Sequence, residues 1–399
     1  MKIIYLSSAC YEKNKYQVDK TAKIKLENNI IKFHNAIIEG LAMQKNVEVK
    51  SIIGLPISIK TNKKIIWKRK IDKEKNIEYY QSGFINLPIL KQSLIAIKTF
   101  KLVKNYIKKA NNEEVAIIYD ASFVSIMPMV NHLIKKYEIK SIGIFADIYD
   151  YMFDVERKSN KNNLIKKIYR RKMQKVYNDT SAYVFLTEYM NEIVNKNKKP
   201  YIIMEGITTL KTDDMICKEE ITKKNYVMYA GGLYEEYGIK NLIEAFSLIE
   251  NNKFELHIYG QGDLENYIKN IKNDNIKYFG VINNELIKQK EKEATLLVNP
   301  RFTDKEYTKY SFPSKTIEYM KSATPVLTTK LKGIPKEYFR YIYTFEEETP
   351  KGMATEIKKI LNKKPEELIE KGIKAKEFVC KEKNNLNQAK RILNLILDS

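Results

Sequence analysis

The sequence lacks several features that would place a protein in a specialised class. Its three cysteines, Cys10, Cys217 and Cys380, form neither a C-x-x-C pair nor a cluster with histidine, so we expect no zinc site and no disulfide framework. No apolar run approaches the roughly 20 residues that a helix needs to cross a bilayer, and the one after Met1 is too short for a secretory signal. We therefore expect a cytoplasmic protein that meets a membrane, if at all, from its surface.

Glycine and proline are scarce, with 14 and 10 among 399 residues, whereas 44% of the residues are apolar and 30% are charged. This composition excludes collagen-like and disordered chains and is typical of folded domains. The length is about twice that of a common single domain. We expect two domains.

Acidic residues are too few to balance the basic ones, and the net charge is +22. Residues 1–200 contain 38 Lys and Arg against 19 Asp and Glu, whereas residues 201–399 contain 33 against 30. A general lysine enrichment would act on both halves, so it explains only part of this asymmetry. A basic N-terminal half favours an acidic partner, such as anionic lipids, a lipid diphosphate or nucleic acid. Because the sequence has no nucleic-acid recognition motif, we expect no nucleic-acid partner.

Short apolar runs alternate with longer amphipathic stretches, which is the pattern of parallel sheets with crossover helices. The expected strands of the first half are residues 2–6, 47–53, 115–119, 139–145, 182–186 and 201–204. Residues 58–86 interrupt this alternation with lysines and tyrosines, and we expect an extra hairpin or a loop there. The expected strands of the second half are residues 226–230, 255–259, 276–279, 295–298, 325–328 and 341–345.

The fold class is therefore α/β, with two tandem Rossmann-like, doubly wound domains. We place an N-terminal domain at residues 1–205, a linker at 206–225 and a C-terminal domain at 226–380. Residues 381–399 are expected to form a helix that could pack back on the N-terminal domain. Two such domains predict an interdomain cleft at the carboxyl ends of the strands.

Glycine turns follow two expected strands of the C-terminal half. Gly231 and Gly232 follow residues 226–230, and Gly260 follows residues 255–259. Backbone can approach a ligand closely at such turns, and the helix that follows favours an anion. A glycine after a strand is also common without any ligand, so these turns alone do not define a site.

A second block of residues follows the expected strand at 295–298. Arg301 comes directly after it, and Pro313 suits the first position of a new helix because proline lacks the N–H group. Ser314 and Lys315 would then face an anion such as a diphosphate. Glu318 shares their helical face, where its carboxylate could accept hydrogen bonds from both ribose hydroxyls of a nucleotide.

The span 226–328 resembles the donor-binding domain of glycosyltransferase family 4, which are retaining enzymes of the GT-B fold. The most specific part is the Ser-Phe-Pro-Ser-Lys-x-x-Glu-Tyr-Met run at 311–320, followed by Pro325-Val326. The resemblance implies transfer of a sugar from a nucleoside diphosphate sugar to a hydroxyl group, with retention and without another cofactor. No strict Asp-x-Asp pair occurs, so we expect no metal.

The resemblance also implies donor-site residues, with departures that matter. Tyr310 stands where the family often has a first glutamate, and the usual arginine and lysine of the first glycine segment are absent, with Lys240 nearby but displaced. We expect Arg301 and Lys315 to supply the catalytic positive charge instead. These departures also permit a second interpretation, in which the chain has lost activity and serves as a binding subunit of a partner transferase. The donor-binding candidates are Gly231, Gly232, Lys240, Gly260, Arg301, Tyr310, Phe312, Pro313, Ser314, Lys315 and Glu318.

The acceptor candidates lie in the N-terminal half, where they follow or flank the expected strands. They are Ser8, His34, Asp120 and Asp150, with Asp147 as a catalytic candidate that could orient the acceptor hydroxyl. Asp147 and Asp150 could instead cap a helix that begins near Tyr151.

Charge and resemblance together predict a lipid-linked or cell-envelope glycan acceptor, reached by a peripheral protein at the inner face of the cell membrane. A basic stripe on an expected helix is either a membrane contact or a solvated face. His257 lies within an expected strand and should be packed. The stripe contains Lys166, Lys167, Arg170, Arg171, Lys172 and Lys175.

Overall fold

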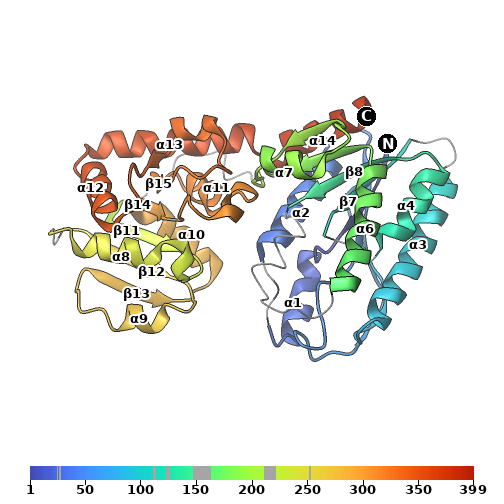
Figure 1. Cartoon of the computed structure of the whole chain (residues 1–399), viewed down its shortest axis with the longest axis horizontal. Coiled ribbons are helices and arrows are strands. Elements are labelled where there is room, and N and C mark those ends of the chain that lie inside the picture. Colours follow the sequence, from blue (N-terminus) through green and yellow to red (C-terminus); the bar gives the residue numbers. More distant parts are fainter. Residues whose placement is uncertain are drawn as a thin grey trace. The chain divides into compact units, whose positions relative to one another are not determined.

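A computed structural model describes residues 1–24, 26, 28–110, 114–122, 126–146, 163–210, 222–250 and 253–399. The chain forms two compact units, shown in Figure 1. The N-terminal unit comprises Met1–Thr209 and Asn385–Ser399, and the C-terminal unit comprises Leu210–Asn384. The boundary at residue 209 falls inside the segment expected as a linker, and all the expected strands are present to within about two residues.

The main sheet of the N-terminal unit has the order β10-β9-β8-β7-β1-β2-β5-β4. Each neighbouring pair is parallel apart from β4 with β5. The strand order reverses between β1 and β7, because β2 lies on the other side of β1. The strands are β1 (Lys2–Ser7), β2 (Glu48–Ile53), β4 (Lys70–Glu74), β5 (Ile77–Gln81), β7 (Val115–Asp120), β8 (Lys140–Phe145), β9 (Ala182–Phe185) and β10 (Tyr201–Ile203).

Of the hairpin or loop expected within residues 58–86, the hairpin is present. The segment also adds a strand to the main sheet and forms a second small sheet, which the sequence does not predict. Strands β4 and β5 form the antiparallel hairpin, and β5 also extends the main sheet by pairing with β2 in parallel. A separate antiparallel pair joins β3 (Ile66–Trp67) to β6 (Phe84–Ile85). The helices of this unit are α1 (Glu12–Lys20), α2 (Asn28–Ala42), α3 (Leu90–Ala110), α4 (Met127–Lys136), α6 (Asn163–Asp179), α7 (Glu188–Val194) and α14 (Asn385–Asp398).

The C-terminal unit contains a parallel sheet with the order β13-β12-β11-β14-β15-β16. Apolar clusters pack on both faces of this sheet, as expected for a doubly wound fold. Its strands are β11 (Lys224–Ala230), β12 (Glu255–Tyr259), β13 (Ile276–Gly280), β14 (Ala294–Asn299), β15 (Val326–Thr328) and β16 (Tyr343–Thr344). Its helices are α8 (Ile239–Ser247), α9 (Glu265–Lys269), α10 (Asn284–Glu293), α11 (Ser314–Lys321), α12 (Pro350–Leu361) and α13 (Pro365–Glu382), with short 3₁₀ turns η2 (Glu235–Tyr237), η3 (Glu306–Lys309) and η4 (Lys336–Arg340).

The C-terminal helix α14 belongs to the N-terminal unit. It packs against α2 and against β8, β9 and β10, and in Figure 1 the red α14 lies beside the blue α2. The backbone N–H of Asn385 donates to the carbonyl of Thr208 over 2.8 Å, and the Gln388 amide donates to the carbonyl of Gly206 over 3.0 Å. The last helix therefore completes the first domain.

Truncation of a buried side chain on α14 should destabilise the N-terminal unit. Ile392 is fully buried, so Ile392→Ala should lower the free energy of unfolding by about 2–5 kcal/mol. Leu397, on the same helix, is 56% exposed, and Leu397→Ala should change the free energy of unfolding by less than about 0.5 kcal/mol. Urea unfolding of both variants measures the difference. Equal effects would contradict the packing of α14.

Candidate functional site

In the C-terminal unit the strand order reverses between β11 and β14, and the loops after these two strands touch. Gly238 follows the β11 loop with φ 75°, a left-handed conformation that favours glycine. A Cβ atom there would lie 2.0 Å from the carbonyl oxygen of Pro300, which follows β14. Only glycine lets these loops approach so closely. Reversals of strand order at the carboxyl edge are the usual ligand sites of such sheets.

The floor of this edge is built from backbone. The N–H of Gly231 donates to the carbonyl of Tyr259 over 3.0 Å. A Cβ on Gly260 would lie 1.8 Å from the carbonyl oxygen of Gly231. Helix α11 is tied to the same point, because the Tyr319 hydroxyl accepts a hydrogen bond from the N–H of Ala230 over 2.9 Å. The structure thus brings Gly231, Gly260 and α11 together.

Helix α11 begins at Ser314, one residue later than the sequence suggests. Pro313 is the N-cap, with an extended ψ of 96°, and not the first helical residue. Ser314 is exposed, and within the described residues no hydrogen bond uses the N–H groups of Ser314 or Lys315. These first-turn donors, at the positive end of the helix dipole, can bind an anion.

Two cations lie at this edge of the sheet. The Lys315 ammonium is 2.8 Å from the Glu318 carboxylate, so these side chains share a face as predicted. Burial alone would lower the pKa of Lys315, but Glu318 and Glu291 hold it above its ordinary value. Arg301 stacks on the Tyr237 ring, 4.4 Å from its centre, and pairs with no carboxylate in the described part of the chain. Both side chains offer N–H donors that a diphosphate can accept.

Asn299, the last residue of β14, carries a further donor. Its side chain is 4% exposed, and its Nδ2 is buried without a hydrogen-bond partner among the described residues. An unsatisfied buried donor costs about 1–3 kcal/mol. A polar ligand at the reversal point could satisfy it. Asn299 is not among the donor candidates that the sequence predicts, although it ends a buried strand.

Three donor candidates take other positions than the sequence suggests. Phe312 is 7% exposed and packs on Tyr338, so its side chain belongs to the core. Lys240 lies 3.7 Å from the Glu235 carboxylate and 5.9 Å from the centre of the Tyr267 ring. The Tyr310 hydroxyl donates to the Glu306 carboxylate over 3.2 Å.

In the N-terminal unit the strand order reverses between β1 and β7, and three acceptor candidates meet there. The Ser8 hydroxyl donates to Asp120 over 3.0 Å. His34 Nε2 lies 3.3 Å from the same carboxylate oxygen, without the alignment of a hydrogen bond. His34 Nδ1 is 2.7 Å from the Tyr5 hydroxyl. The polar network therefore runs from buried Tyr5 to half-buried Ser8.

His34 does not face an acceptor, because its side chain is fully buried. It lies behind Asp120, which is 2% exposed and also accepts hydrogen bonds from the N–H and hydroxyl of Ser122. Burial alone would raise the pKa of Asp120, but His34 and the Ser122 hydrogen bonds lower it to about 2. Asp120 is thus a fixed negative charge that orients Ser8 and Ser122.

A cavity of about 690 Å³ opens beside this network, lined by Ser8, Ser122, the loop after β2 and the start of α3. Lys91 lies in its wall and is 7% exposed. Its ammonium donates to the carbonyls of Leu55 and Ile57 over 2.6 and 2.5 Å and pairs with no carboxylate in the described ranges. Burial lowers the pKa of Lys91 to about 8. Lys91 could not be identified from the sequence, because its burial depends on the loop whose carbonyls it binds.

Two acceptor candidates, Asp147 and Asp150, lie outside the described residues. The same holds for the side chains of Lys166, Lys167 and Arg170 of the basic stripe. The other stripe residues, Arg171, Lys172 and Lys175, are exposed on α6.

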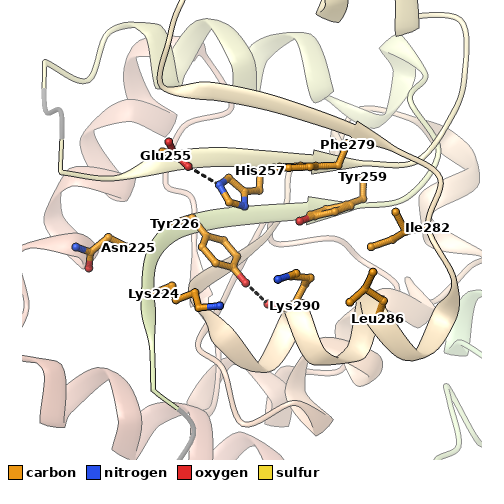
Figure 2. Close-up of a pocket in the computed structure, with 10 residues that line it drawn as sticks. All are labelled: Lys224, Asn225, Tyr226, Glu255, His257, Tyr259, Phe279, Ile282, Leu286 and Lys290. Atoms are coloured by element: carbon orange, nitrogen blue, oxygen red, sulfur yellow. Dashed lines mark hydrogen bonds and ion pairs between the residues drawn. The ribbon is translucent and has the colours of Figure 1, made fainter.

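A second cavity, of about 490 Å³, lies beside β11, β12 and β13 of the C-terminal unit, and its lining runs from Lys224 at the start of β11 to Tyr259 at the end of β12 (Figure 2). His257 stacks on Tyr226 with ring centres 4.1 Å apart, and its Nε2 is 2.6 Å from the Glu255 carboxylate. Burial lowers the pKa of His257. The histidine is packed, as the sequence predicts, and none of the candidate site residues lines this cavity.

Comparisons with known proteins concern the second half of the sequence and the fold of the whole chain. Residues 212–396 match the family model of Glycosyl transferases group 1. The sequence has no match among the curated proteins.

The whole chain is similar to solved structures of low sequence identity. A sucrose-phosphate synthase from Thermosynechococcus elongatus has a TM-score of 0.64 at 14% identity, with 100% of both chains covered. The catalytic domain of starch synthase IV from Arabidopsis thaliana, bound to ADP and acarbose, has a TM-score of 0.66 at 9% identity, covering 100% of this chain and 99% of the other. HepE from Anabaena, in complex with UDP, has a TM-score of 0.59 at 11% identity, with 100% of both chains covered.

At these identities the likeness shows the fold alone, and the fold is GT-B, as predicted. The group 1 match and this fold together indicate a glycosyltransferase.

The Asp120 network should make stability depend on pH. The folded pKa of Asp120 is about 2, below the roughly 3.9 of an unfolded aspartate. Its stabilising effect is therefore complete above about pH 4 and is lost as the pH falls through the folded value. Asp120→Asn should lower the free energy of unfolding by about 1–3 kcal/mol at neutral pH and by less near pH 2.

Urea unfolding at a series of pH values tests this expectation. Asp304→Asn is the control, because Asp304 is exposed and pairs only with its neighbour Lys305. A difference between the wild type and Asp120→Asn that stayed constant across the acid range would contradict the assignment.

Proposed function

We propose that this protein is a retaining glycosyltransferase that moves a sugar from a nucleoside diphosphate sugar to a hydroxyl of a lipid-linked or cell-envelope glycan. The proposal rests on the groups found at the carboxyl edge of the C-terminal sheet, next to β11 and β14. Interlocked glycine turns, the first-turn N–H groups of α11 and two cations meet there. Anion-binding donors at a reversal of strand order suit a nucleoside diphosphate.

The chemistry requires charge stabilisation above all. As the glycosidic bond to the diphosphate breaks, the anomeric carbon becomes cationic and the leaving diphosphate gains negative charge. Arg301, Lys315 and the N–H groups of α11 are placed to stabilise that negative charge. We propose that the reaction needs neither a metal nor another cofactor, since the sequence has no strict Asp-x-Asp pair.

We propose that Glu318 binds the ribose of the donor. Its carboxylate lies one helical turn after Ser314, on the face of α11 that also carries Lys315. A carboxylate there can accept hydrogen bonds from two neighbouring hydroxyls while the helix N-terminus holds the diphosphate.

The acceptor is assigned to the cavity beside Ser8 and Asp120. Ser8 and Ser122 present hydroxyls at its mouth, oriented by the fixed charge of Asp120. We propose that Asp147 orients the acceptor hydroxyl and that Asp150 contributes to its binding, as the sequence suggests.

The positive charge of residues 1–200 supports the proposal that the enzyme acts at an anionic membrane surface, on the inner face of the cell membrane. Over the residues that the structure describes, no helix has the length and apolar character needed to cross a bilayer.

The contact between Tyr310 and Glu306 favours an active enzyme over an inactive binding subunit. Tyr310 replaces the glutamate that the family resemblance implies, yet its hydroxyl donates to the carboxylate of Glu306 over 3.2 Å. A carboxylate is therefore present next to that position, and it is exposed.

Donor binding tests the proposal directly. Calorimetry without added metal should show binding of one of UDP, GDP or ADP and of its sugar conjugate. Glu318→Ala removes hydrogen bonds to a charged group, so it should weaken the binding of the nucleotide by about tenfold to a hundredfold. Arg301→Gln should weaken the binding of the nucleoside diphosphate. The affinity for the nucleoside alone should not change.

Glu356→Ala is the matched control, because Glu356 lies on α12 and pairs with Lys359 outside the site. Affinity equal to that of the wild type is expected for it. If no nucleotide bound the wild type, the donor-site assignment would be wrong. Binding without turnover, given a competent acceptor, would instead identify a binding subunit.

A further inference from the structure

Seven large apolar side chains of the N-terminal unit are exposed at residue 24 and in the segments 59–66 and 87–90, of which the last two contribute residues to the wall of the acceptor cavity. We call this set the apolar rim. Soluble proteins tolerate single exposed apolar residues, but a contiguous group marks an interaction surface. The rim consists of Ile24 (63% exposed), Ile59 (39%), Ile65 (52%), Ile66 (67%), Leu87 (42%), Ile89 (83%) and Leu90 (40%).

Hydrogen bonds hold the rim segments side by side. The N–H of Ile24 donates to the carbonyl of Thr61 over 3.2 Å, and the N–H of Asn86 donates to the carbonyl of Ile65 over 2.7 Å. Ile66 pairs with Ile85 across the β3–β6 ladder. Ser58, Thr61 and Ile89 also line the cavity of about 690 Å³. The rim segments are therefore neighbours, and Ile89 belongs both to the rim and to the cavity wall.

The charge around the rim has one sign. Lys23, Lys60, Lys63, Lys64 and Lys68 are exposed among the rim residues. The sequence contains no Asp or Glu at 49–71 or at 79–112, which together supply most of the rim. Exposed apolar groups surrounded by lysines complement an anionic bilayer, whose interface offers acyl chains next to negative headgroups.

We propose that the apolar rim docks the N-terminal unit on an anionic lipid bilayer, with the isoleucines inserted among the headgroups and the acceptor cavity facing the membrane. This proposal rests on the proposed function, because it says where that enzyme would meet its lipid-linked acceptor. It differs from one of the two sequence-based interpretations of the basic stripe on α6, in which that stripe contacts the membrane. That stripe has exposed cations at Arg171, Lys172 and Lys175. No large apolar residue is exposed between residues 171 and 175.

The single tryptophan gives a direct view of this surface. Trp67 follows Ile66 on β3 and points inward, 5% exposed, with its indole N–H donating to the carbonyl of Lys64 over 3.0 Å. It lies immediately beneath the rim. Vesicles with brominated acyl chains should quench its fluorescence if the rim inserts, and should leave it unchanged if α6 makes the contact.

Flotation with vesicles measures the docking itself. The wild type should bind vesicles of equal parts phosphatidylglycerol and phosphatidylcholine, and bind pure phosphatidylcholine much more weakly. The triple variant Ile65→Ser, Ile66→Ser, Ile89→Ser should bind about tenfold more weakly or worse. The control triple Leu248→Ser, Ile369→Ser, Leu397→Ser removes apolar side chains of similar exposure elsewhere and should bind like the wild type.

A matched pair of charge variants separates the rim from the stripe. Lys60→Gln, Lys63→Gln, Lys64→Gln and Arg171→Gln, Lys172→Gln, Lys175→Gln each remove three cations. The first set should weaken vesicle binding more than the second. Stronger loss from the α6 set would overturn the proposal, as would wild-type binding by the isoleucine triple.

No vesicle binding by the wild type would also overturn the proposal. Sedimentation would then show whether the rim instead pairs two copies of the chain. Nucleotide affinity, measured on the same isoleucine triple, should equal that of the wild type. Because that readout needs no membrane, a failed docking surface can be distinguished from a failed donor site.

Discussion

The structure of the candidate site depends on the close approach of backbone at two glycines. A Cβ on Gly260 would lie 1.8 Å from the carbonyl oxygen of Gly231, and one on Gly238 would lie 2.0 Å from that of Pro300. These contacts draw the loops after β11, β12 and β14 together at the carboxyl edge of the sheet. Helix α11 can then reach the same edge, where Tyr319 binds the end of β11. Any larger residue would push the loops apart and remove the anion-binding geometry.

Both units apply one topological rule to different chemistry. In each, the strand order reverses beside the first strand, and polar residues follow the two strands at the reversal. The C-terminal unit places cations and N–H groups there, which suits a diphosphate. The N-terminal unit places hydroxyls around the buried carboxylate of Asp120, which suits a hydroxyl acceptor.

The strands and the donor-site helix could be predicted because their signals are local. Buried parallel strands are continuous apolar runs, a glycine turn follows the end of β11 at Ala230, and Pro313 marks the start of α11. Burial depends on the whole fold, and here the sequence was less informative. It did not reveal that Phe312 and His34 are buried, that Lys91 lies in a cavity wall, or that β5 joins the main sheet. The apolar rim could not be predicted from a periodic pattern either, because its residues come from three separate segments.

The central claim is that a nucleoside diphosphate binds at the reversal point of the C-terminal unit. A crystal structure of the protein with the nucleotide that calorimetry selects tests it most directly. We expect the diphosphate at the N-terminus of α11, between the Gly231 turn and Arg301, with the ribose hydroxyls on Glu318. A nucleotide bound in the cavity of Figure 2, or anywhere in the N-terminal unit, would contradict the account.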